Sequence, residues 1–270
     1  MVDWDDFDFE EPQLEGGSDE YESAACETLA KFFELNHAEV FFGNQLAVQN
    51  EDKFFHWITY RAIGHLVANG IVLTERRKMS IGSEIKLVWH RKHRYYKRDA
   101  KRVVGLVDEY GSPNICAAMG LHGEQMILAG FARKQFVLRE HNTRRFLDRQ
   151  WTETDHNLDF IFERDGKAYG VEVKNTLSYM DRKEFEIKML LCETLGVTPV
   201  FAVRMMPKTW VFELIEKGGY ALILKYQLYP WTHIELARRV SRELGLPVDA
   251  PKALSSGTMD RFETWHNKRL

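Results

Sequence analysis

Two segments near the middle of the chain, 158–162 and 169–174, alternate apolar and polar residues with the two-residue period of a β-strand. In the first, every second residue from Leu158 is apolar, so we expect these residues to share one face. The connection contains Asp165-Gly166, a dipeptide typical of a tight hairpin turn. With these two residues as the turn, Asp159 is predicted to lie directly opposite Glu172 on the neighbouring strand.

The surrounding pattern extends this hairpin into an α/β (α+β) domain over 113–248. Helical spacing of apolar residues and short apolar runs predict helices at 123–134, 210–215 and 232–244 and strands at 136–138 and 220–224. Residues 249–270 are polar, and we expect them to form a loosely held C-terminal tail.

An earlier group of elements forms a second predicted domain over 21–95. Helices are expected at 21–35 and 52–69, the latter ending at Asn69-Gly70, followed by strands at 71–74 and 85–89. Helices followed by a hairpin are typical of a winged helix-turn-helix, although any small α+β module has the same parts. A basic helical connector, 96–112, then leads to the turn residues Gly111-Ser-Pro-Asn114.

Charge is distributed unevenly along the 270 residues, although 37 Lys and Arg against 40 Asp and Glu give a net charge of only -3. Ten acids and no base precede residue 23, and residues 1–20 are predicted to be an acidic disordered tail. Between residues 75 and 102 there are eleven bases and three acids, with aromatic residues interleaved. This pattern suits a nucleic acid, whereas a solvated surface is the simpler alternative. The candidate phosphate contacts are Arg76, Arg77, Lys78, Arg91, Lys92, Arg94, Lys97 and Arg98.

Other features of the composition narrow the class of protein. The three cysteines are far apart, without the spacing of a zinc site or a disulfide framework. No apolar run reaches the roughly 18 residues that span a bilayer, and the N-terminus is acidic where a signal peptide is basic. We therefore expect a cytoplasmic protein with no membrane contact.

The predicted pairing of Asp159 with Glu172 indicates a metal site. Side chains directly opposite in an antiparallel pair have Cβ atoms roughly 4.5 to 5.5 Å apart, and like charges there repel. A divalent cation reverses this interaction, and Mg²⁺ commonly binds one or two carboxylates together with water and substrate phosphate. Lys174 lies two residues beyond Glu172 and therefore on the same strand face. Its ammonium is suited to positioning a water or stabilising charge on a phosphate.

The stretch from Asp159 to Asn175 resembles the restriction-endonuclease-like superfamily, the PD-(D/E)xK nucleases, and within it the archaeal Holliday-junction-resolvase-like branch. The resemblance covers about 114–207 and implies a restriction-endonuclease-like core, a mixed central sheet flanked by helices, with a helix at 182–195 and a strand at 199–203. It implies that Asp159 and Glu172 bind Mg²⁺, with Mn²⁺ as a substitute, and that Lys174 assists phosphodiester hydrolysis. Many members add an acid from the first core helix, for which Glu124 is the matching residue. Leu158 stands where the motif has proline.

Four further residues were assigned by their positions near this motif. Asn175 is interpreted as a support for the metal ligands, and His156 as either a phosphate-orienting or a structural residue at the strand entrance. Glu184 and Lys188, on the following helix, are expected on a solvated face, with contact to a backbone phosphate as the alternative for Lys188.

The sequence therefore predicts a Mg²⁺-dependent DNA endonuclease, with structure-selective cleavage and a homodimer left open. A winged-helix DNA-binding regulator on an inactive nuclease-like fold is the alternative, and an RNA nuclease is the third.

Overall fold

The computed structural model describes residues 18–270, so most of the predicted acidic tail lies outside the described residues. The chain divides into two compact units, which are described separately. Unit 1 comprises the described part of Met1–Cys116 together with Arg239–Leu246, and unit 2 comprises Ala117–Arg238 and Pro247–Leu270. No helix within 18–270 is both long and apolar enough to cross a membrane.

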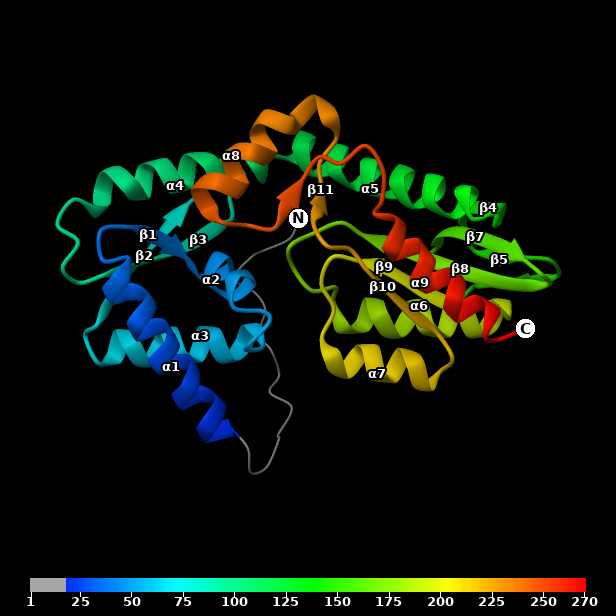
Figure 1. The fold of residues 1–270 in the computed structure, drawn as a ribbon, viewed down its shortest axis with the longest axis horizontal. Coiled ribbons are helices and arrows are strands. Elements are labelled where there is room, and N and C mark those ends of the chain that lie inside the picture. The colour runs from blue at the N-terminus through cyan, green and yellow to red at the C-terminus, as the bar shows by residue number, and fades with distance from the viewer. Residues whose placement is uncertain (1–17) are drawn as a thin grey trace. The chain divides into compact units, whose positions relative to one another are not determined.

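Unit 1 combines helices with a three-stranded antiparallel sheet (Figure 1). Its elements are α1 (Ser18–Leu35), β1 (Val40–Phe42), α2 (Gly43–Gln49), α3 (His56–Ala68), β2 (Val72–Lys78), β3 (Glu84–His90) and α4 (Tyr96–Tyr110). The sheet order is β1-β3-β2, so the predicted β2–β3 hairpin is present but carries a third strand that the sequence pattern did not indicate. Helix α3 begins at His56, four residues later than expected, because 51–54 form turns before it.

A segment from far along the chain completes unit 1. The side-chain amides of Gln45 and Gln49 in α2 both donate to the carbonyl oxygen of Leu244, each at 2.8 Å. Leu244 ends helix α8 (Ile234–Leu244), and Arg239 of that helix lies 2.9 Å from Glu109 of α4. The unit is therefore discontinuous in sequence.

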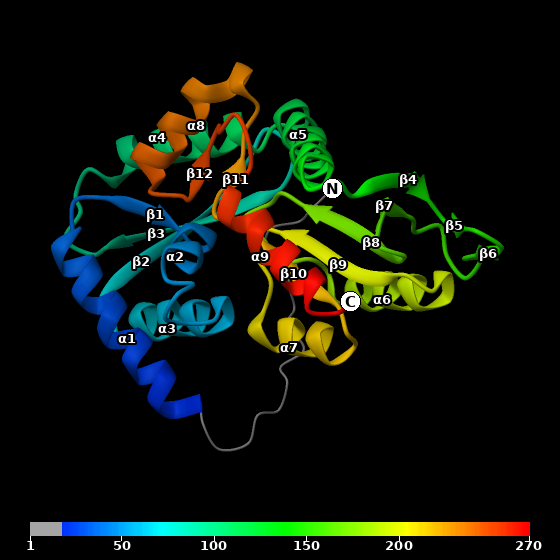
Figure 2. The same cartoon turned by 45° about the vertical axis from the view of Figure 1, so that its right-hand side comes forward.

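Unit 2 is built on a mixed five-stranded sheet with the order β10-β9-β8-β7-β4 (Figures 1 and 2). Strands β4, β7 and β8 pair antiparallel, whereas β8, β9 and β10 pair parallel. The main elements are α5 (Pro113–Arg133), β4 (Val137–Thr143), β7 (Leu158–Arg164), β8 (Lys167–Lys174), α6 (Arg182–Leu195), β9 (Thr198–Val203), α7 (Lys208–Glu216), β10 (Tyr220–Ile223) and α9 (Ser256–Asn267). Short elements complete the chain: β5 (Arg145–Phe146), β6 (Arg149–Gln150), β11 (Gln227–Leu228), η1 (Trp231–His233) and β12 (Val248–Asp249). The predicted mixed α/β architecture is confirmed.

The central hairpin has the predicted register. Pairing runs from Arg164 opposite Lys167 to Phe160 opposite Val171, and the next positions along the two strands are Asp159 and Glu172. The turn residues Asp165 and Gly166 both have positive φ, 52° and 70°, as a two-residue hairpin turn of this kind requires. The turn chemistry therefore sets which residues oppose each other.

One expected facing of β7 is wrong. Phe160 and Phe162 pack in one buried cluster, but Leu158 packs with Ile161 in another, against the C-terminal part of α6. Strict alternation therefore does not extend to the start of β7, and both sheet faces are covered by apolar residues.

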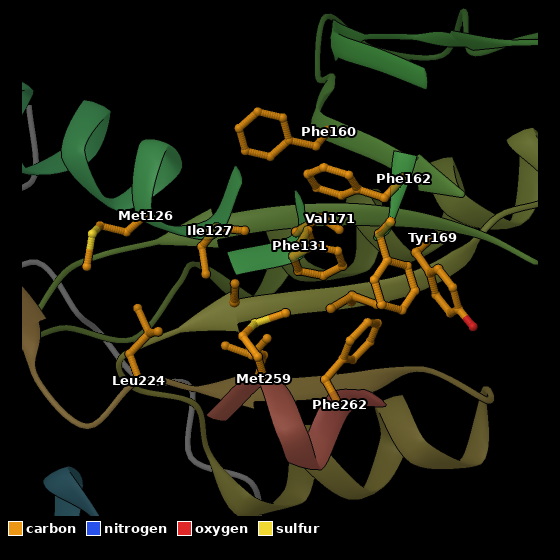
Figure 3. Packing of buried hydrophobic residues seen from close by; sticks show 14 of the residues in the cluster. Met126, Ile127, Phe131, Phe160, Phe162, Tyr169, Val171, Leu224, Met259 and Phe262 are labelled. Atoms are coloured by element: carbon orange, nitrogen blue, oxygen red, sulfur yellow. The ribbon is translucent and has the colours of Figure 1, made fainter. Parts of the chain in front are cut away.

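The C-terminal residues are not the loose tail that their polarity suggested. Helix α9 places Met259 and Phe262, 4% and 0% exposed, among the aromatic residues of the sheet (Figure 3). His266 is fully buried, and its ring contacts the hydroxyl of Tyr169 at 2.5 Å and the carboxylate of Asp165 at 3.0 Å. A few apolar side chains at helical spacing are enough to dock this polar helix.

Candidate functional site

The two acids of the central hairpin lie within the body of unit 2. Glu172 is 3% exposed, and an oxygen of Asp159 accepts a hydrogen bond from the backbone N–H of Val173 at 2.7 Å. Burial, and secondarily the charge of Asp159, raises the pKa of Glu172 to about 7. Burial also raises the pKa of Asp159, although the Val173 hydrogen bond and the neighbouring lysines oppose this rise. Removal from water therefore disfavours the anionic form of both carboxylates.

Lys174 completes this group as the sequence predicted. Its Nζ lies 3.6 Å from Oε1 of Glu172 and 2.7 Å from Oε1 of Glu184 in α6. Burial alone lowers the pKa of Lys174, but the two carboxylates outweigh it and the pKa is raised. Lys174 therefore remains an ammonium at neutral pH, which suits charge stabilisation and water positioning better than proton abstraction.

A second lysine, Lys188 of α6, was wrongly expected on a solvated face. It is 4% exposed, and its Nζ lies 2.6 Å from Oε2 of Glu172 and 2.5 Å from the backbone oxygen of Asn157. The sequence contains a signal for this position, since Lys188 falls at helical spacing between Phe185 and Cys192, which are both buried. A polar residue inside an apolar helical stripe indicates a buried partner.

Glu124 approaches the acid pair from helix α5. Its pKa is raised by burial and by the charge of Asp159, and His141 of β4 lowers it. The position of α5 is fixed by close packing next to Glu124, because a Cβ added at Gly123 would lie 2.8 Å from the Cβ of Asn175. The helix and the end of β8 therefore approach at a distance that only glycine allows.

The two remaining candidates have structural contacts. Asn175 is 4% exposed and its amide bonds backbone groups of Met119 and Leu228, at 2.6 to 2.9 Å. It thus supports the site indirectly, by fixing the chain beyond Lys174. The ring of His156 lies 2.9 Å from the hydroxyl of Thr154, and within residues 18–270 no hydrogen bond joins it to Asp159 or Glu172.

The donor set is compatible with a hard divalent cation. Within the described part of the chain, no three or more His, Cys, Asp or Glu side chains converge as a metal-binding group, so Glu124 is not assembled with the other two acids into one ligand cluster. Mg²⁺ needs only one or two carboxylates, with water and phosphate at its other positions. Asp159 and Glu172 supply oxygen donors of this kind, and their mutual repulsion favours a cation between them.

The basic candidates of unit 1 differ in how far their charge is already compensated. Arg76, Lys78, Arg91, Lys92, Arg94, Lys97 and Arg98 are exposed, and Arg77 is half-buried. Four of the eight have acidic neighbours: Arg76 with Glu84 at 3.8 Å, Arg77 with Glu75 at 2.7 Å, Lys92 with Glu34 at 3.1 Å and Arg98 with Asp99 at 3.8 Å. Among the described residues, the other four make no ion pair, so they retain the charge that a phosphate would bind.

Comparison with known proteins identifies no relative: no protein-family model, no curated protein and no solved structure matches the chain.

Proposed function

We propose that the protein is a Mg²⁺-dependent DNA endonuclease. The observation that supports it is the hairpin register, which brings Asp159 beside Glu172 in a buried site with Lys174 at 3.6 Å from Glu172. Adjacent carboxylates whose pKa values are raised by burial, with a lysine beside them, are concentrated at functional sites.

In this proposal each residue has a distinct role. Asp159 and Glu172 hold the divalent ion, which when bound polarises the phosphate and lowers the pKa of its bound water. The Lys174 ammonium stabilises negative charge that develops on the phosphate, and Glu184 orients that ammonium through the 2.7 Å contact. Glu124 supplies a further acceptor for water at the edge of the site.

The finer fold assignments belong to the same proposal. The order α5, β4, β7, β8, α6 and β9 in unit 2 supports a restriction-endonuclease-like core. In unit 1, helices α1 to α3 followed by the β2–β3 hairpin support a winged-helix-like module that grips the DNA backbone. Phosphate contacts of this kind give affinity and register but little sequence information.

The proposal is tested by incubating the purified protein with plasmid, linear duplex, branched DNA and single-stranded RNA, with Mg²⁺, Mn²⁺ or chelator. DNA cleavage that requires the metal and is lost in Asp159→Ala supports it. Metal-dependent cleavage of RNA alone reassigns the substrate, and cleavage that survives chelation contradicts the proposed site.

One observation favours a DNA-binding regulator without nuclease activity as the second candidate. Glu172 already has an ammonium at 2.6 Å, so its charge is compensated by the protein itself. Tight binding of DNA without cleavage under any metal, unaffected by Asp159→Ala, would favour this candidate.

A further inference from the structure

Lys188 links the two halves of the acid pair. Its side chain is 5% exposed, and its ammonium bonds both Glu172 of β8 and the carbonyl of Asn157, two residues before Asp159. A buried ammonium is costly unless it is paired and hydrogen-bonded, and both conditions are met here. The lysine therefore fixes the entrance of β7 and the end of β8 with one charge.

This contact makes the two oxygens of Glu172 unequal. Oε2 is bonded to Lys188 at 2.6 Å, whereas Oε1 is 3.6 Å from Lys174, whose closer partner is Glu184. The two oxygens of Asp159 also differ, because Oδ2 accepts a hydrogen bond from the backbone N–H of Val173. One oxygen of each acid remains without a hydrogen bond from these groups.

We propose that the Lys188 ammonium occupies Oε2 of Glu172 and thereby limits the acid pair to one divalent ion. This ion would bind through Oε1 of Glu172 and Oδ1 of Asp159. The inference rests on the proposed function, since it takes Asp159 and Glu172 as the metal ligands. Two-metal sites hold their ions about 3.5 to 4 Å apart. A fixed ammonium on the second oxygen stands where another ion would have to bind and repels it.

The consequence for catalysis is one of positioning. Lys188 is buried, and it holds Glu172 and the chain before Asp159 in one geometry. Its removal is expected to strengthen metal binding, because a repelling charge is lost, and to slow cleavage, because the ligands lose their fixed positions. General damage to the fold would weaken both.

The test counts bound Mn²⁺ by electron paramagnetic resonance titration at pH 8, with turnover measured in parallel. Wild type and Lys183→Met, which removes an exposed lysine of the same helix, should bind one ion per chain. Lys188→Met should bind its first ion about tenfold more tightly and accept a second, while turnover falls. Lys188→Arg keeps the positive charge and should bind one ion per chain, as the wild type does. Lys188→Gln keeps a donor for the carbonyl and removes only the charge, so it serves if the Met variant fails to fold.

Two outcomes overturn the inference alone: two ions in the wild type that both require the acid pair, or unchanged stoichiometry and affinity in Lys188→Met or Lys188→Gln. If the wild type binds no Mn²⁺, or binds it equally after Asp159→Ala, the proposed function fails as well.

Discussion

Gly123 and Asn175 approach so closely that a Cβ on the glycine would lie 2.8 Å from the Cβ of the asparagine. Gly123 precedes Glu124 in α5, and Asn175 follows Lys174 at the end of β8. This contact sets the distance between the helix and the acid-bearing strands, so the site depends on a residue that has no side chain.

Gly123→Ala is therefore expected to destabilise the protein by about 1 to 3 kcal/mol, because the helix must shift against a close-packed neighbour. Gly120→Ala is the matched control on the same helix, where an added Cβ meets nothing within 4 Å. The control should be neutral or stabilising by up to about 1 kcal/mol, through the better helix propensity of alanine. Urea unfolding of both variants measures the difference, and equal effects would contradict the packing argument.

Removing the acids should eliminate metal-dependent cleavage while the protein stays folded. Asp159→Ala and Glu172→Gln are the appropriate variants, because Glu172→Ala would leave the Lys188 ammonium buried without its partner. Lys174→Ala should reduce turnover without weakening Mn²⁺ binding, since the lysine is not a ligand and its charge, 3.6 Å from Glu172, repels the ion. Cleavage assays with a parallel Mn²⁺ titration separate these roles. Full activity in either acid variant, or loss of Mn²⁺ binding in Lys174→Ala, would contradict the assignment.

Stability and metal binding should depend on pH through Glu172. Its pKa is raised in the fold from 4.5 to about 7, so the folded state binds the proton more tightly than the unfolded chain. In chelator, stability should therefore fall as pH rises from about 4.5 to 7 and change little above that range. Mg²⁺ must displace this proton, so the Mg²⁺-induced increase in Tm should be larger at pH 8 than at pH 6. Glu172→Gln should flatten both dependences, and a wild-type shift that is the same at the two pH values would count against the metal assignment.

The uncompensated bases of unit 1 should dominate DNA affinity. Reversing Arg91 and Arg94 to glutamate should weaken binding to all sequences alike and flatten the slope of log affinity against log salt, because fewer counterions are released. Lys31→Glu with Lys53→Glu changes the net charge equally at exposed positions outside the basic segment. Fluorescence anisotropy at several salt concentrations distinguishes them. Equal losses in both double variants would mean that only net charge matters.

Helix α9 should contribute strongly to stability. Phe262→Ala removes a fully buried ring and is expected to cost about 3 to 5 kcal/mol, whereas Phe212→Ala, at a ring 65% exposed, should cost little. Thermal unfolding checks the pair. A small loss of stability in Phe262→Ala would indicate that the C-terminal residues are loosely held, as the sequence suggested.

The parts of the fold that could be predicted from sequence are those with a strong local signal. The Asp165-Gly166 turn has a backbone preference that fixes the register. The helix at 182–195, which the resemblance implied, has the expected ends because Asp181 caps it and Gly196 terminates it. Helix α5 begins ten residues earlier than predicted, at Pro113, since the turn-like Gly111-Ser-Pro-Asn114 is compatible with a proline in the first helical turn.

The parts that could not be predicted depend on tertiary contacts. Strand β1 is three residues long and exists because it pairs with β3. Of the site, Asp159, Glu172 and Lys174 were predicted through the register, but Lys188 and Glu184 meet them only after α6 packs on the sheet. Both residues were predicted to lie on the solvent-exposed face of the helix, because charged residues are rarely buried without a partner.

The bonds from Gln45 and Gln49 to Leu244 also have a consequence for synthesis on the ribosome. Their acceptor is translated nearly 200 residues after α2. At common elongation rates of about 5 to 20 residues per second, the nascent N-terminal unit waits on the order of ten seconds or more for its last helix. During that interval the side-chain amides of Gln45 and Gln49 lack the carbonyl that they bond in the finished protein. A fragment ending at Cys116 reproduces this waiting state rather than the native unit.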